Sequence, residues 1–184
     1  MRSLQIINSF IQRYKWTARA DRLGPDMLAT HFQMFIPVLH EKICRRKFKT
    51  YKDGADFRIG AYAINCSNIN LGKNVVIRPQ CMLIADNEGE IVIKDDVLIA
   101  PGVHIYVNNH EFARIDIPIN QQGYTPSQSV VIEEGAWIGA NVVILPGVKI
   151  GKNAVIGAGS IVTKSIDSYC LAVGNPAKVI KEFR

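Results

Sequence analysis

The sequence of 184 residues has no long apolar run, since nowhere do the roughly 18 consecutive apolar residues of a transmembrane helix occur. Its first residues, MRSLQIINSFIQRYKW, are too polar and too basic for the apolar segment of a signal peptide. We therefore expect a folded protein of the cytoplasm.

A CxxC pair is also absent. The four cysteines, Cys44, Cys66, Cys81 and Cys170, are scattered along the chain. This spacing is typical of buried thiols and not of a disulfide framework.

Acidic residues are scarce in the amino-terminal part: residues 1–52 carry eleven Lys/Arg against three Asp/Glu, within a net charge of +6. The basic stretch CRRKFKTYK (44–52) lies in no known nucleic-acid motif, so we expect no nucleic-acid partner. Residues 1–16 place apolar side chains near helical spacing. We expect a helix packed on its own protein, with contact to a membrane surface as the alternative.

What the sequence does have is a period of six. From Ile132 onward it divides into the blocks IEEGAW, IGANVV, ILPGVK, IGKNAV, IGAGSI and VTKSID, each opened by an aliphatic residue. Similar blocks start at Ile93, Ile99 and Ile105, and again from Ile59 to Met82, where only the block at Asn65 lacks an aliphatic opener. Neither a helix nor a plain strand demands this period, whereas a short strand followed by a tight corner does.

Three blocks make one triangular coil, and stacked coils about 4.8 Å apart let each strand pair with residues 18 positions away. The blocks amount to about four coils. Small residues at the corners should adopt positive φ at little steric cost; these are Gly60, Gly72, Gly139, Gly151 and Gly157, with Asn74, Asn141 and Asn153.

Two segments interrupt the period. LIADNEGEIV (83–92) adds four residues and predicts a small acidic bulge. Residues 108–129, NNHEFARIDIPINQQGYTPSQS, contain 21 residues that do not fit the repeat, and they must leave the coil as a loop. His110 stands where this loop begins, so it is either a corner residue or the base of an active site.

The block pattern resembles the hexapeptide-repeat family. The resemblance implies a mainly β fold, a left-handed parallel β-helix of hexapeptide repeats with an amino-terminal helical segment and a protruding loop. The amino-terminal residues 1–56 are expected to form a helical segment, split at LGPDM and again near Pro37 and packed on the prism. The resemblance implies an acyltransferase domain over residues 57–184, with the loop 108–129 and a carboxy-terminal tail. Members of this family associate as homotrimers, which we expect here too.

The stretch IVIKDDVLIAPGVHIYVNNHEF is similar to a segment of hexapeptide sugar acetyltransferases in which a catalytic histidine follows the APGVxIY block. In the family that histidine is typically followed by Pro; here His110 is followed by Glu111. The segments IPINQQGY and AVGNPAKVIKE resemble the branch that O-acetylates bacterial surface polysaccharides. The resemblance implies an acetyl-coenzyme A-dependent O-acetyltransferase for a sugar hydroxyl, with His110 as general base.

The donor should lie in a groove between two subunits. By resemblance its contacts are Trp137, Gly139, Ala140, Ala158, Thr163, Lys164, Lys178 and Lys181, and a backbone N–H of Gly139 or Ala140 would stabilise the oxyanion. Loop residues suited to stacking on or hydrogen-bonding an acceptor are Phe112, Arg114, Gln122 and Tyr124. Sugar-acetylating relatives often have Asn where this sequence has Met82, so the acceptor pocket should differ. The ring of His110 would be oriented by a loop carbonyl, by Glu111 or by Asp116.

Three other functions compete with this one. Hexapeptide-repeat carbonic anhydrases bind zinc, but His104 and His110 stand six residues apart, on different sides of the prism, so we expect no metal site. A structural scaffold without activity would not need the loop with His110. Transfer to the nitrogen of an amino sugar or of a serine-type acceptor is the remaining alternative, because an amine needs similar base chemistry.

Overall fold

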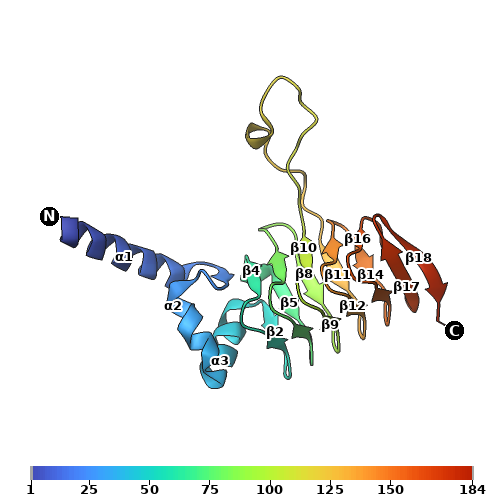
Figure 1. Cartoon of the computed structure of the whole chain (residues 1–184), viewed down its shortest axis with the longest axis horizontal. Coiled ribbons are helices and arrows are strands. Elements are labelled where there is room, and N and C mark those ends of the chain that lie inside the picture. The colour runs from blue at the N-terminus through green and yellow to red at the C-terminus, as the bar shows by residue number, and fades with distance from the viewer. Residues whose placement is uncertain (1, 184) are drawn as a thin grey trace.

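The computed structural model describes residues 2–183, with their side chains from residue 5 onward. Helices occupy the amino-terminal end and a stack of short strands forms the rest (Figure 1). The helices are α1 (Arg2–Arg19), α2 (Leu28–His31) and α3 (Pro37–Lys47), with the 3-10 turn η1 (Phe32–Phe35) between the last two. The expected breaks near LGPDM and Pro37 are confirmed. No helix within residues 2–183 combines the length and the apolarity needed to cross a bilayer.

Short strands make three parallel sheets, which are the three faces of a prism. Face A contains β1 (Arg22–Leu23), β4 (Tyr62–Ile64), β7 (Met82–Ile84), β10 (His104–Tyr106), β13 (Val143–Ile144) and β16 (Ile161–Val162). Face B contains β2 (Thr50–Tyr51), β5 (Ile69–Leu71), β8 (Ile91–Ile93), β11 (Val130–Ile132) and β14 (Lys149–Ile150). Face C contains β3 (Asp56–Phe57), β6 (Val76–Ile77), β9 (Leu98–Ile99), β12 (Trp137–Ile138), β15 (Val155–Ile156), β17 (Cys170–Gly174) and β18 (Ala177–Glu182).

The chain runs from face A to face B to face C and back, so each strand pairs with the strand of the same face in the next coil. The mainly β, parallel β-helix architecture is confirmed, with five coils instead of about four because parallel pairing already begins at β2. The two exceptions are antiparallel: β1 closes the amino-terminal end of face A against β4, and β18 returns along β17.

The expected register is confirmed where the repeat is uninterrupted, since Val131 pairs with Lys149, 18 positions further on. Leu71 pairs with Ile93, 22 positions on, because the bulge adds four residues to the 18-residue repeat. Ile105 pairs with Ile144, 39 positions on, because the 21-residue loop is added to the 18-residue repeat. Insertions therefore leave the prism at a corner and do not alter the pairing of the strands.

The block frame expected from Ile59 is wrong upstream of Leu71. The buried residues in the repeat position are Phe57 and Ala63, because the 3-10 turn η2 (Cys66–Asn68) adds two residues to the first coil. This turn explains why the block at Asn65 has no aliphatic opener. From Leu71 to Val162 the openers are buried as predicted and fill the prism with stacked aliphatic side chains.

The corner residues divide into two kinds. Gly60, Asn74, Asn141 and Asn153 have positive φ, as expected. Gly72, Gly139, Gly151 and Gly157 do not, and there the prediction is wrong. They are small for another reason: a Cβ on Gly139 would lie 2.6 Å from the Ala158 backbone nitrogen in the next coil.

The four cysteines are free and buried, as predicted. Burial raises the pKa of the Cys44 and Cys66 thiols to about 12. These thiols therefore stay protonated and contribute to packing rather than to nucleophilic chemistry.

Candidate active site

The loop 108–129 leaves the prism at the corner between face A and face B, which we call the A/B corner (Figure 1). Its two ends are joined at the base by a short antiparallel contact between His110 and Tyr124. The Glu111 N–H donates to the Gly123 carbonyl over 3.1 Å, and the Thr125 N–H donates to the Asn109 carbonyl over 2.8 Å. The loop base is thus held by main-chain hydrogen bonds, although the loop tip projects into solvent.

The ring of His110 is exposed and stacks on the ring of Tyr124, with centroids 4.4 Å apart and planes inclined by 30°. Stacking fixes the plane of the imidazole while leaving its nitrogens accessible. The carboxylate of Asp116, one of the three groups considered for orienting the ring, instead accepts from Arg114 Nε at 3.1 Å. Tyr124 therefore positions His110 in this structure, a role that sequence spacing did not predict.

An open cavity of about 630 Å³ adjoins the loop base, lined by the bulge 84–88 and by the segment 124–127, which includes Tyr124. Asp86 links these two walls. Its Oδ2 accepts from Asn108 Nδ2 at 2.6 Å and from the Ser127 hydroxyl, while its Oδ1 accepts from the Gly89 N–H at 2.6 Å.

These contacts set the charge state of Asp86. Partial desolvation would raise the pKa of the Asp86 carboxyl, but the hydrogen bonds from Ser127 and from the bulge backbone outweigh it and lower that pKa. The acidic bulge expected over 83–92 is therefore an anchor for the loop, which links residues 22 and 41 positions apart in sequence.

The four loop residues predicted to meet an acceptor have different surroundings. The Gln122 amide is used within the loop: its Oε1 accepts from the Arg114 N–H at 3.0 Å and its Nε2 donates to the Arg114 carbonyl at 2.7 Å. Arg114 also pairs with Asp116. Tyr124 lines the cavity, whereas Phe112 does not, although both rings are exposed. Tyr124 is the one of the four that the structure brings to the cavity.

The predicted donor residues gather in part on the opposite edge of face A, at the corner between face C and face A, which we call the C/A corner. Trp137 lies half-exposed on face C between Leu98 and Val155 of the adjacent coils. Ala140 and Ala158 occupy the C/A corner in neighbouring coils, where the Gly159 N–H donates to the Ala140 carbonyl at 2.8 Å.

The predicted oxyanion donors are not equivalent. The Gly139 N–H donates to the Ile156 carbonyl at 2.8 Å, so it is not available to an oxyanion and that expectation is wrong. The Ala140 N–H makes no such backbone contact among residues 2–183. Gly139 instead permits the close approach of two coils beneath this corner.

The other four predicted donor contacts fall into two groups. Lys178 and Lys181 lie exposed on β18, paired with Val173 and Leu171 at the carboxy-terminal end of face C. Thr163 and Lys164 follow β16 and are exposed at the A/B corner, the same corner from which the loop with His110 leaves.

Within one chain the two corners stand apart. Face A separates His110 from Ala140, and one face of six residues spans up to about 20 Å at about 3.3 Å per residue. A single chain therefore does not place the imidazole beside Ala140 and Ala158.

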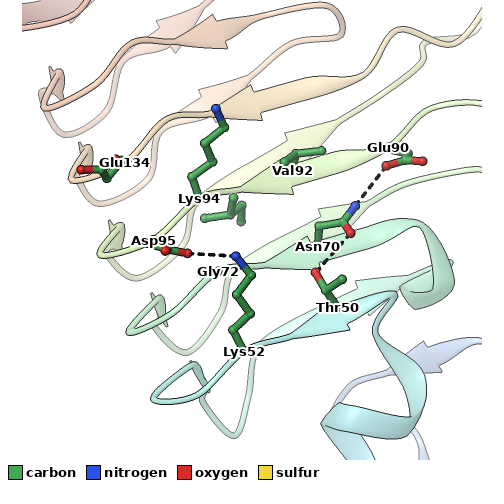
Figure 2. Close-up of a pocket in the computed structure, with 10 residues that line it drawn as sticks. Thr50, Lys52, Asn70, Gly72, Glu90, Val92, Lys94, Asp95 and Glu134 are labelled. Atoms are coloured by element: carbon green, nitrogen blue, oxygen red, sulfur yellow. Dashed lines mark hydrogen bonds and ion pairs between the residues drawn. The ribbon is translucent and has the colours of Figure 1, made fainter.

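A second cavity, of about 490 Å³, lies on face B and holds no predicted site residue (Figure 2). Its side chains pair with one another: Lys52 Nζ lies 3.5 Å from Asp95 Oδ1, and Asn70 Nδ2 donates to Glu90 Oε2 at 3.0 Å. Glu133 on the same face binds both Lys94 and Lys149. These contacts link coils one or two positions apart along the prism, and we assign them a structural role.

Faces A and B differ in character. The outward side chains of face A are mostly apolar and half-buried, such as Ile64, Met82 and Ile84, in contrast to the paired charges of face B. No group of three or more potential metal ligands occurs within residues 2–183. His104 is engaged otherwise, with its Nδ1 3.1 Å from the Tyr106 hydroxyl.

Comparison with known proteins gives the class. A family model described as bacterial transferase hexapeptide (six repeats) matches residues 129–164. Galactoside O-acetyltransferase of Escherichia coli (strain K12) is 37% identical over 142 residues, which are 77% of this chain and 68% of that protein.

Two solved structures have the same fold. A maltose O-acetyltransferase from Clostridium difficile 630 is 35% identical with a TM-score of 0.67, covering 81% of this chain and 77% of that one. A galactoside acetyltransferase in complex with coenzyme A is 34% identical with a TM-score of 0.74, covering 84% and 79%. The chain thus belongs to the hexapeptide-repeat acetyltransferase family, as its block pattern indicated. It is an acyltransferase, and its relatives act on galactosides and on maltose.

Proposed function

We propose that this chain is an acetyl-coenzyme A-dependent O-acetyltransferase of a sugar hydroxyl, with His110 as the general base. The observation that carries the proposal is the exposed imidazole of His110, which stacks on Tyr124, a residue that lines the cavity at the loop base. The coenzyme A complex of a relative that is 34% identical supports acetyl-coenzyme A as the acyl donor.

In the proposed reaction the sugar hydroxyl attacks the thioester carbonyl directly. A neutral imidazole nitrogen of His110 takes the hydroxyl proton as the new C–O bond forms. The C–S bond then breaks, and the leaving thiolate recovers that proton from the imidazolium. The Ala140 N–H is the proposed donor to the oxyanion that develops in between.

The reaction requires a homotrimer, because His110 and Ala140 lie on opposite edges of face A. Three prisms whose A faces surround a threefold axis would place the C/A corner of each copy beside the A/B corner of the next. The half-buried apolar side chains of face A, such as Met82 and Ile84, support this arrangement, since it would bury them.

The groove formed by these two corners suits an elongated donor. Ala140 and Ala158 are small and stacked in adjacent coils, so the pantetheine arm would run along the solenoid past them with its thioester toward the coil of His110. Thr163, Lys164, Lys178 and Lys181 belong to the last coil and the carboxy-terminal hairpin, and the lysines would meet the phosphates of the nucleotide. Trp137, on face C, would form a wall of the groove.

The acceptor would enter the cavity between the bulge and the loop base, where Tyr124 offers a ring for a sugar to stack on. We propose a surface polysaccharide or its precursor as the acceptor, on the resemblance of IPINQQGY and AVGNPAKVIKE to that branch. A cytoplasmic location accords with the four free, buried thiols.

The test is an assay of coenzyme A release with a galactoside, maltose, polysaccharide repeat units and an amino sugar, with products identified by mass spectrometry. We expect an O-acetyl ester, and we expect His110→Ala to lower kcat about 10²- to 10⁴-fold with unchanged affinity for coenzyme A. A matched control, His40→Asn in α3, should retain kcat. Wild-type turnover in His110→Ala would remove His110 from the mechanism, and an amide as the only product would replace O- with N-acetylation.

A further inference from the structure

Helix α1 (Arg2–Arg19) projects beyond the amino-terminal end of the prism (Figure 1). Among its described side chains, from residue 5 onward, the buried one is Thr17 near the end of the helix, whose hydroxyl accepts from the Ala29 N–H of α2 at 3.2 Å. The expectation that this segment packs on the prism therefore does not describe most of α1.

An apolar face runs along the projecting part of α1. It consists of Ile6, Ile7, Phe10, Ile11 and Tyr14, whose side chains are between 41% and 69% exposed. At 100° per residue these five positions cover an arc of about 140°. So wide an exposed apolar arc on a helix requires a partner.

The charges of α1 indicate which partner. The helix contains no acidic residue. Arg13 and Lys15 fall just outside the two edges of the apolar arc, and Arg19 lies further along the Lys15 side. Three copies of such a helix bundled together would bring like charges close, with no carboxylate on the helices to pair with them. An anionic lipid surface offers the opposite charge at the edges and an apolar interior for the arc.

We infer that α1 binds anionic membrane surfaces, lying in the headgroup region with its apolar face toward the acyl chains. The helix does not cross the bilayer, in accord with its polar far side, which carries Gln5, Asn8, Ser9 and Gln12. This inference goes beyond the acetyltransferase activity and does not depend on it.

Co-sedimentation of the full chain with vesicles tests the inference. Vesicles of phosphatidylcholine and phosphatidylglycerol (70:30) should retain the protein at low salt, and retention should fall at 0.5 M NaCl because the lipid charge is screened. Vesicles of phosphatidylcholine alone should retain much less. Equal binding to both, or no binding to either at millimolar lipid, would overturn the inference.

Two sets of variants test the apolar face of α1 and its basic residues separately. Ile7→Ser with Phe10→Ser should weaken binding to anionic vesicles at least about 10-fold, and Arg13→Gln with Lys15→Gln about 10- to 30-fold. Two controls should bind like wild type: Gln5→Ser with Gln12→Ser on the polar side, and Lys73→Gln with Arg78→Gln on the prism. All these residues are exposed, so circular dichroism and melting temperature should stay unchanged.

Light scattering distinguishes lipid from a second copy of the chain. The Ile7→Ser, Phe10→Ser variant should have the same mass in solution as wild type. If its mass falls, the apolar face is covered by another copy in the assembly, and the inference is overturned. Neither measurement involves acetyl transfer, so failure here leaves the proposed function untouched.

Discussion

At the scale of single residues, the candidate site depends on how His110 is held. An exposed imidazole on a long loop would normally sample many orientations, but the main-chain contact between His110 and Tyr124 and the stacking of their rings restrict it. Only the exposed nitrogens of a fixed ring can meet a substrate hydroxyl repeatedly in one geometry.

The stacking partner gives the first prediction. Tyr124→Ala should lower kcat about 10-fold, since the imidazole loses the surface that fixes its plane, whereas Tyr124→Phe should retain most of the rate. Steady-state kinetics with both variants checks this. If Phe proves as damaging as Ala, the tyrosine hydroxyl takes part in the reaction, and stacking is not its main role.

Asp86 gives the second prediction. Asp86→Asn should lose about 1 to 3 kcal/mol of unfolding free energy at pH 7, because the carboxylate accepts hydrogen bonds from Asn108, Ser127 and the bulge backbone. Urea denaturation measures this. Glu88→Gln, a neighbouring carboxylate on the same bulge, is the matched control and should change stability little.

The pH dependence of this stabilisation follows from the direction in which folding shifts the pKa of Asp86. The pKa of Asp86 is lowered in the folded state, so its contribution is fully present above its ordinary value of 3.8 and is lost as the pH falls below that. The difference in stability between wild type and Asp86→Asn should therefore shrink below about pH 4. A difference that persists at pH 2 would show that the mutation acts through packing and not through charge.

At the scale of elements, the carboxy-terminal hairpin of β17 and β18 carries two of the predicted donor contacts, Lys178 and Lys181. The double variant Lys178→Ala, Lys181→Ala should weaken coenzyme A binding roughly 5- to 30-fold and leave a smaller dependence of Kd on salt, since two charges proposed to bind phosphate are gone. Calorimetry at 0.05 and 0.5 M NaCl measures both. Lys73→Ala with Arg78→Ala removes the same charge elsewhere, and an equal loss there would indicate a general charge effect.

The six-residue period of the sequence predicted most of the strands and corners of the prism. Aliphatic openers every six residues require strand and corner in alternation, so the coils, the bulge and the loop all follow from counting. The count of six residues per block failed at Asn65, because a 3-10 turn adds two residues there. It also did not predict β1, which joins face A by pairing two of its residues with β4. Neither feature leaves a periodic signal.

The contacts that organise the site were also beyond the sequence. Asp86, Asn108 and Ser127 are far apart in the chain and meet only because the bulge and the loop leave the same corner of adjacent coils. The use of the Gly139 N–H by the Ile156 carbonyl likewise depends on which coil lies above which. The order in which the coils are stacked decides which of these groups meet, and this order cannot be read from the local sequence pattern.

At the scale of the whole molecule, the proposed site is shared between copies, and this can be tested by complementation. His110→Ala removes the base at the A/B corner, and Ala158→Arg should block the donor groove at the C/A corner. Each variant alone should be inactive, whereas trimers assembled from both should regain activity at those sites that combine two intact corners. If the mixed trimers are inactive, each site is formed by the two corners of a single chain, and the model of a site shared between copies is wrong.

The prism keeps its 18-residue pairing immediately after the loop returns, as though the loop were absent. Lengthening such an excursion adds only a slowly growing entropic cost, about 0.6 kcal/mol for each doubling. Exchange of the tip between Phe112 and Gln122 would therefore leave folding nearly unaffected while changing the side chains that the loop carries next to His110. Selection could diversify acceptors on this scaffold without rebuilding the scaffold itself.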